Sequence, residues 1–106
     1  MDCLDSFIQA VREDRFVEAH EILEESWKEL KKSDMTEANF QKGLINGATA
    51  IALYIKGKKV QALRVWTTFE KYRDILKQNE FKDSSRYKTA EKLLDEKYEK
   101  YNQLKI

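Results

Sequence analysis

One short segment of the chain holds most of the side chains whose types and spacing could carry chemistry. His20 is the only histidine, and it opens the sequence HEILE, which also contains Glu21 and Glu24. Glu18 and Trp27 flank this sequence on either side. Residues four apart share one face of a helix, so the side chains of His20 and Glu24 can meet. An imidazole beside a carboxylate can transfer protons, bind a divalent cation or hold a polar ligand.

The spacing of these groups is incomplete for the metal sites that it most resembles. The zinc-protease pattern H-E-x-x-H requires a second histidine where this chain has Glu24. A di-iron bundle requires E-x-x-H pairs on two helices, and no such pair recurs in the sequence. We therefore expect no metal and no cofactor. If a hard or borderline divalent ion binds, His20 and Glu24 are its candidate ligands.

Three interpretations of the His20 cluster stay open on the sequence alone. In the first, a buried structural network, His20 bonds Glu24 or an amide side chain. The candidate amides belong to the following helix, at Gln41 and Asn46. In the second, the same groups line a small-molecule pocket, and in the third they bind a metal ion. The apolar pattern predicts that His20 faces inward. It does not decide which of Glu21 and Glu24 also faces inward, because rotating the helix by one residue step exchanges the two.

Other catalytic and binding patterns are absent from the sequence. It contains no G-x-S-x-G elbow and no glycine-rich phosphate loop. Trp66, Phe69 and Tyr72 recur at helical spacing, which favours a core or an interface over a platform for stacking bases. The 20 basic and 19 acidic residues give a net charge of +1, which argues against a nucleic-acid surface or an anionic-membrane surface.

Composition also limits the expected compartment. The single cysteine, Cys3, excludes an intrachain disulfide and fits a reducing cytoplasm. The longest apolar run, residues 48–55, is far too short to span a bilayer. Asp2 and Asp5 stand where a signal peptide would carry basic residues. We therefore expect a cytoplasmic protein with no membrane partner.

The elements that position the candidate side chains are predicted to be helices. No proline and only three glycines occur in 106 residues, and 42% of the residues are hydrophobic, which favours long helices around one core. We predict a single all-α domain over residues 1–106. Thr36 is the expected N-cap of the third helix, and Gly57 is the residue expected to stop it. The apolar spacing places the five helices over residues 2–13, 16–32, 36–56, 58–78 and 85–104.

Two features indicate how the helices pack. Gly43 and Gly47 lie four apart on one face of the third helix, where a neighbouring helix could approach closely. The segments 16–22 and 59–65 resemble each other, and each opens a helix with a small alanine, Ala19 or Ala62. This echo is typical of two helical hairpins stacked in tetratricopeptide fashion, here a compact bundle with a C-terminal helix. The fourth helix is predicted to turn inward Val60, Leu63, Trp66, Phe69, Tyr72 and Leu76.

Two blocks of the sequence resemble a known family. Residues 16–27, FVEAHEILEESW, are similar to the signature F-x-E-A-H-E-x-L-E-x-x-W of the family catalogued as domain of unknown function 309. Residues 43–48, GLINGA, followed by Gly57 and Ala62, resemble that family's second block. Asn46 departs from the pattern, which has glutamine there, so its shorter amide would reach less far.

The resemblance extends over about residues 7–76. It implies a small helical bundle, mainly from bacteria and archaea, with no established activity. It also implies that the family's motif positions are Glu18, His20, Glu21, Glu24 and Trp27.

Taken together, the sequence favours a non-enzymatic helical binding module or protein-interaction module. Its expected site is a groove beside His20, Glu24, Trp27 and Asn46, or an exposed aromatic face of the fourth and fifth helices. Five tyrosines, three of them in the last helix, make a homodimer or another protein partner plausible. The alternative is an enzyme, or a protein that binds a metal or small molecule, using His20 with Glu21 or Glu24.

Overall fold

A computed structural model describes residues 1–103 of the chain. This part contains five helices and no strand, which confirms the predicted all-α bundle. The helices nearly match their predicted ranges, and Leu104, the predicted end of the last helix, lies outside the described residues. Their bounds are α1 Cys3–Arg12, α2 Phe16–Leu30, α3 Met35–Ile55, α4 Lys59–Gln78 and α5 Ser84–Gln103.

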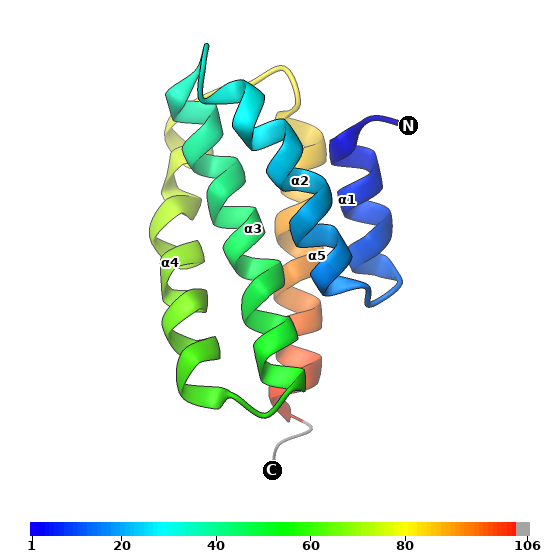
Figure 1. Ribbon diagram of the computed structural model, residues 1–106. Helices are drawn as coiled ribbons and strands as arrows, with labels where there is room; N and C mark the ends of the chain where they lie inside the picture. The colour runs from blue at the N-terminus through cyan, green and yellow to red at the C-terminus, as the bar shows by residue number, and fades with distance from the viewer. Residues whose placement is uncertain (104–106) are drawn as a thin grey trace.

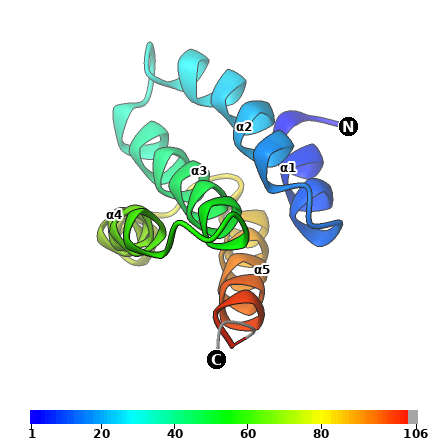
Figure 2. The ribbon, with the colours of Figure 1, turned by 60° about the horizontal axis from the view of Figure 1, so that its bottom comes forward.

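The first four helices are neighbours in chain order, and α5 closes the bundle from behind. Helix α2 packs on α1, α3 packs on α2, and α4 packs on α3. Helix α5 packs on α1 and α3, so it lies behind the front layer in Figure 1. Figure 2 shows α4 and α5 on different sides of α3. Helix α3 is therefore the central element, with α2 and α4 on either side and α5 behind it.

The core depends on a close approach of α4 and α5 to α3. Gly43 and Gly47 are both buried in α3. A Cβ atom at Gly43 would lie 2.8 Å from the Cβ of Tyr72 on α4, and one at Gly47 would lie 2.9 Å from the Cδ1 of Leu94 on α5. The Cβ of Tyr72 cannot move without its helix, so α3 and α4 pack this closely only because residue 43 is a glycine. At Gly47 the methyl group of Leu94 could shift, but the ring of Phe69, 3.2 Å from the added Cβ, also restricts the space. The predicted close approach is confirmed.

The prediction for the inward face of α4 is wrong in its first turns. Val60 and Leu63 are 73% and 57% exposed, whereas Ala62 is fully buried. The buried stripe continues from Ala62 through Trp66 and Phe69. Both stripes have helical spacing, and the small alanine takes the inward position because it permits closer packing between helices.

The aromatic residues of α4 and α5 pack against each other instead of forming an exposed face. The rings of Trp66 and Tyr98 stack with centroids 3.8 Å apart and planes 5° apart. Tyr87 is fully buried, and the half-buried Tyr101 meets the ring of Phe16 edge-on, with centroids 5.9 Å apart. These rings contribute to the core, so the expected exposed aromatic surface is wrong.

Two turns between helices each contain one residue with a left-handed backbone conformation. Asp14, in the turn before α2, has φ +62°, and Gly57, directly after α3, has φ +83°. Glycine adopts this left-handed conformation without a steric penalty, which explains why Gly57 terminates α3 as predicted. Asp34, rather than the predicted Thr36, caps α3, since its Oδ1 accepts a hydrogen bond from the Glu37 N–H at 3.0 Å.

We expect Asp34→Ala to lower the free energy of unfolding by about 1 kcal/mol, because the first turn of α3 loses its side-chain acceptor. Thr36→Ala is the matched control at the position that the sequence favoured, and it should change stability by less than about 0.5 kcal/mol. Urea denaturation followed by circular dichroism measures both. An equal loss in the two variants would contradict the assignment of Asp34 as the cap.

Candidate functional site

Four of the six predicted site residues line one hollow between α2 and α3. This hollow has a volume of about 250 Å³, and its lining includes His20, Glu24 and Trp27 of α2 and Asn46 of α3. A second hollow of about 190 Å³ shares His20 with the first, and Thr49 lines both. We call the two hollows together the α2–α3 groove. Its remaining lining residues are Val17, Lys42, Ile45, Ala52, Leu53 and Lys56.

Helical spacing explains why these side chains meet. His20, Glu24 and Trp27 follow each other at four and three residues, so they form one row along α2. Asn46 and Thr49 follow the same spacing along α3. The adjacent faces of α2 lie in the core, where Ala19 and Leu23 are fully buried. The rows therefore stand on two packed helices, which fixes the shape of the groove.

His20 and Glu24 form the contact that their spacing predicts. The Nε2 atom of His20 lies 3.5 Å from the Oε2 atom of Glu24. Their side chains are 35% and 41% exposed, so His20 lies at the edge of the core and is not turned fully inward. The pair faces solvent and the groove, where either group can meet a ligand.

The amide partners predicted for His20 bond elsewhere. Gln41 donates from its Nε2 to the hydroxyl oxygen of Tyr87 at 2.9 Å, within the core. Asn46 donates from its Nδ2 to the carbonyl oxygen of Lys42 at 2.8 Å, one turn earlier in its own helix. The amide alternatives of the structural network are therefore not found, whereas its other alternative, the contact of His20 with Glu24, is present at a half-exposed position. Asn46 still lines the groove.

Glu18 and Glu21 lie outside the groove. Glu18 forms an ion pair with Arg15, and Glu21 is exposed. Both line a separate open hollow at the start of α2, and His20 does not contribute to it. Of the two candidate carboxylates beside His20, Glu24 is the one that contacts it. An activity that needs a carboxylate next to the imidazole would use Glu24.

Trp27 forms one end of the groove, where two lysines approach its ring. The Nζ atom of Lys31 lies 4.1 Å from the ring centroid, and that of Lys42 lies 5.7 Å from it. Both distances allow a cation–π attraction. The indole is half-buried and its face is covered by ammonium groups, so this end of the groove is positively charged.

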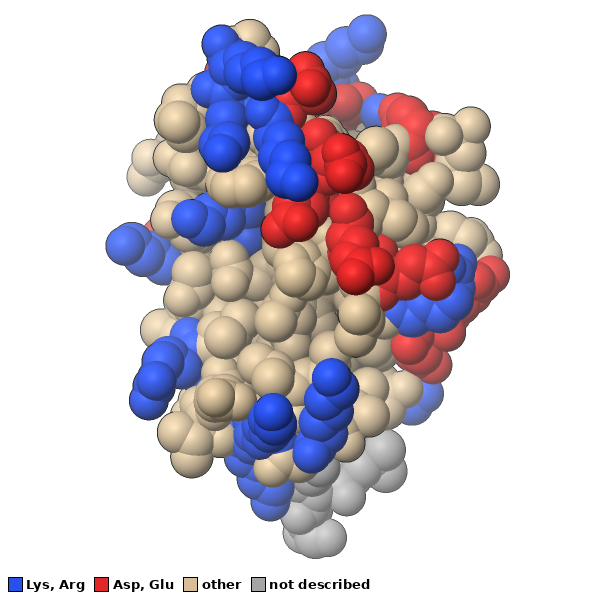
Figure 3. Space-filling view, viewed as in Figure 1, with Lys and Arg blue, Asp and Glu red and all other residues tan. Residues whose placement is uncertain are grey.

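Sequence reasoning missed the residues of α3 that line the groove beside Asn46. The signal was available, because α3 carries no charged residue between Lys42 and Lys56. Thr49 and Leu53 recur in this uncharged stretch at helical spacing, and both are half-buried. Figure 3 shows an uncharged surface between lysines and arginines at its two ends, with acidic side chains along α2. The groove is therefore a weakly polar surface with charged borders.

Within residues 1–103, no group of three histidine, cysteine, aspartate or glutamate side chains is arranged to hold a metal ion. His20 and Glu24 supply only two such groups. None of the helices in the described part combines the length and apolar character that a bilayer crossing requires.

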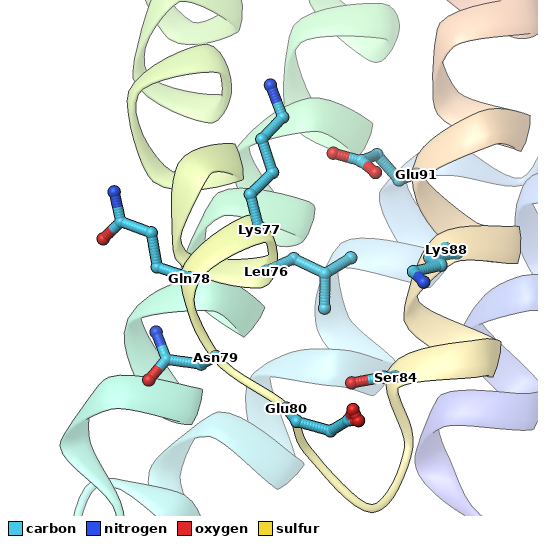
Figure 4. Close-up of a pocket in the computed structure, with 8 residues that line it drawn as sticks. All are labelled: Leu76, Lys77, Gln78, Asn79, Glu80, Ser84, Lys88 and Glu91. Atoms are coloured by element: carbon cyan, nitrogen blue, oxygen red, sulfur yellow. The ribbon is translucent and has the colours of Figure 1, made fainter.

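A larger hollow than the α2–α3 groove lies between the end of α4 and the start of α5. It has a volume of about 690 Å³, and Leu76 points into it in Figure 4. Gln78 and Asn79 point away from this space. The Lys77 ammonium lies 3.6 Å from the Asp74 carboxylate. The lining of this open hollow mixes basic, acidic and amide side chains and includes none of the predicted site residues, so we do not take it as the site.

Comparison with known proteins gives one match. The family model described as Domain of unknown function (DUF309) matches residues 4–65, more than half of the chain. The matched part spans α1, α2, α3 and the start of α4, and it includes every residue of the α2–α3 groove. No curated protein and no solved structure matches the chain significantly. The chain belongs to the domain of unknown function 309 family.

Proposed function

We propose that the chain is a non-enzymatic binding module and that the α2–α3 groove holds a short segment of a partner protein. One observation carries the proposal: His20, Glu24, Trp27 and Asn46 line a single hollow on the surface. None of them belongs to the fully buried core, so their role is not explained by packing alone. Polar groups above an apolar floor are typical of a binding surface.

The length of the groove supports a polypeptide segment as the ligand. The two ends are lined by Lys42 of α3 and by Lys56, the residue directly after α3, which are fourteen positions apart. At the helical rise per residue this separation is roughly 21 Å. An extended segment of about six residues, or a helix of four turns, covers that distance.

The chemistry of the groove defines the segment more closely. Ile45, Ala52 and Leu53 offer apolar surface along the floor. The lysines at the two ends favour carboxylates at the ends of the ligand. We therefore propose a segment with apolar side chains in its middle and acidic side chains at its ends. His20 and Asn46 would bond its backbone between these points.

Replacing Thr49 with arginine is expected to weaken the binding of such a segment by at least about tenfold, because the long side chain would fill the centre of the groove. Thr67→Arg is the matched control. Both threonines donate from Oγ1 to the carbonyl four residues earlier, but Thr67 is exposed on α4 outside the groove.

The probes are random peptides displayed on phage and selected on the wild-type chain alone. Isothermal titration then compares the selected peptides on the wild type and on both variants. Trp27 fluorescence provides a second readout, since the other tryptophan, Trp66, is only 8% exposed. Peptides that bind Thr49→Arg as tightly as the wild type, or a selection that yields no binding peptide, would overturn the proposal.

We further propose that residues 1–106 form one domain that works in the cytoplasm of a bacterium or archaeon. The core supports a single domain, because its buried residues come from all five helices. The single cysteine, Cys3, is compatible with a reducing compartment. The family resemblance supports the proposed source.

A further inference from the structure

A further hollow, which shares no lining residue with the α2–α3 groove, lies at the C-terminal end of α2. It has a volume of about 490 Å³ and forms where α1 and α3 begin, α2 ends and the segment before α5 passes, at the top of Figure 1. We call it the end hollow. Its lining is strongly acidic, and the polar groups used below are Asp2, Glu25, Glu29, Glu37, Gln41 and Asp83.

Part of this negative charge is already balanced. Arg86 donates hydrogen bonds to Asp2 at 3.0 Å and to Asp83 at 2.6 Å. The Nζ atom of Lys32 lies 3.5 Å from Glu29. Within residues 1–103, Glu25 and Glu37 form no ion pair with a basic side chain. The end hollow therefore has two carboxylates without a basic partner, one of which, Glu37, already accepts a hydrogen bond from the Tyr87 hydroxyl.

Gln41 provides an observation that is independent of the acidic residues. Its side chain lines the end hollow, the residue is only 3% exposed, and its Nε2 donates to the hydroxyl oxygen of Tyr87. Within the described part of the chain, its buried Oε1 atom has no hydrogen-bond partner. A buried carbonyl oxygen without a donor is costly, and native structures rarely leave one unpaired.

The neighbouring hydrogen bonds determine which amide atom of Gln41, the nitrogen or the oxygen, has no hydrogen-bond partner. The Tyr87 hydroxyl donates its single proton to Oε2 of Glu37, because an ionised carboxylate can only accept. Burial and the bond to Glu37 raise the pKa of Tyr87, so the hydroxyl keeps that proton. The Tyr87 oxygen must then accept from Gln41, which places the amide N–H₂ on Tyr87. The carbonyl oxygen is therefore the group left without a donor, and because it is almost fully covered, a ligand reaches it only when side chains at the rim of the end hollow move aside.

We propose that the end hollow binds an organic cation with N–H donors, namely a primary ammonium or guanidinium group. An N–H of this group would donate to Oε1 of Gln41, and its charge would be balanced by Glu25 and Glu37. A carboxamide oxygen together with carboxylates accepts several N–H donors at once, as these cations require. A bare metal ion is a poorer fit, since no three acidic side chains within residues 1–103 converge on one point.

Butylammonium and tetramethylammonium make a decisive pair of probes, because they carry the same charge but only the first has N–H donors. Titrations followed by amide chemical shifts in nuclear magnetic resonance should show butylammonium binding to residues around Gln41. Tetramethylammonium should bind at least about tenfold more weakly, because it cannot donate to the carbonyl oxygen. Equal binding of the two ions would overturn the proposal, since simple charge attraction would then be sufficient.

Two variants test the residues themselves. Gln41→Met removes the acceptor with little change in volume and should weaken butylammonium binding at least about tenfold. Glu25→Gln removes one exposed carboxylate that lines the end hollow and leaves the core intact. It therefore tests the proposal even if Gln41→Met does not fold. It should weaken binding by about threefold to tenfold. The control Glu96→Gln removes an exposed carboxylate on α5 outside the end hollow and should bind as the wild type.

Two further probes identify the source of the cation. Spermidine represents a free polyamine, and a short peptide with one central lysine represents a side chain of a partner protein. Tighter binding of either probe than of butylammonium supports the site and names its source. Unchanged binding in both Gln41→Met and Glu25→Gln, or no binding of any ammonium probe at millimolar concentration, would overturn the proposal. The groove variant Thr49→Arg should leave these titrations unchanged, which separates this site from the proposed function.

Discussion

Phe69→Ala is expected to lower the free energy of unfolding by about 3–5 kcal/mol, the cost of truncating a fully buried aromatic side chain in a packed core. Phe69 is 0% exposed, and its ring centroid lies 4.8 Å from that of Trp66. The guanidinium carbon of Arg73 also lies 4.8 Å from the ring of Phe69. Its ring atoms approach the backbone of α3 at Gly47 so closely that a Cβ there would lie 3.2 Å away. Alanine would leave a cavity on the side of α3 that faces α4.

This loss is a large share of the stability of a domain of this size, which is typically about 5–15 kcal/mol. Urea denaturation measures it, and Thr67→Ala, on the exposed side of the same helix, is the control with an expected change below about 0.5 kcal/mol. A loss below about 1 kcal/mol for Phe69→Ala would contradict the close packing of α3 and α4. Because α3 also forms one wall of the groove, we expect Phe69→Ala to make the groove less rigid, although Phe69 does not line it.

Much of the helical framework could be predicted because the relevant signals are local. The chain lacks proline, and Gly57 ends α3 through a backbone angle that only glycine adopts readily. Gly43 and Gly47 predicted a close helix approach, since two glycines in a helix are unfavourable unless the space is used. The start of α3 was harder to place, because Asp34 and Thr36 are both good caps and the sequence does not decide between them.

The inward face of α4 and the depth of His20 could not be predicted from periodicity. Periodicity predicts which side of a helix faces the core only when one side is apolar. Helix α4 has apolar residues on two adjacent sides, one including Val60 and the other Ala62. His20 lies at the border of its apolar stripe, where a small rotation changes a buried side chain into a half-exposed one. The choice depends on which neighbouring helix approaches, and a single sequence does not contain that information.

The contacts between segments that are distant in the chain also could not be predicted from the sequence. Gln41 and Tyr87 are 46 positions apart, and Glu37 and Tyr87 are 50 positions apart. No local pattern marks such partners. The end hollow depends on these bonds, since they decide which atom of Gln41 is left without a donor. Of the two proposed sites, the α2–α3 groove could be predicted because its rows of side chains follow local helical spacing, whereas the end hollow is visible only in three dimensions.

Arg73→Met is expected to lower the free energy of unfolding by about 2–3 kcal/mol, because it removes the cation that joins α4 to α5. Arg73 donates to Glu91 at 2.8 Å and to both carboxylate oxygens of Asp95, at 2.8 and 2.5 Å. Burial alone would lower the pKa of Arg73, but its bonds to Asp95, Glu70 and Glu91 raise it above the ordinary value. Glu91, whose side chain is only 18% exposed, would lose its positive partner. The estimate lies below that for a fully buried pair because the Asp95 side chain is 43% exposed.

A double variant separates the loss of the cation from the loss of packing. Arg64→Met is the matched control, since Arg64 is exposed and its side chain forms no ion pair within the described residues. Its expected change is below about 0.5 kcal/mol. If stranded carboxylates cause the loss, adding Glu91→Gln to Arg73→Met should restore about 1 kcal/mol, because the buried charge is then removed. No recovery in the double variant would show that Arg73 stabilises the bundle mainly through its contact with the ring of Phe69. The two predicted losses would then be strongly non-additive, since both would report the same contact.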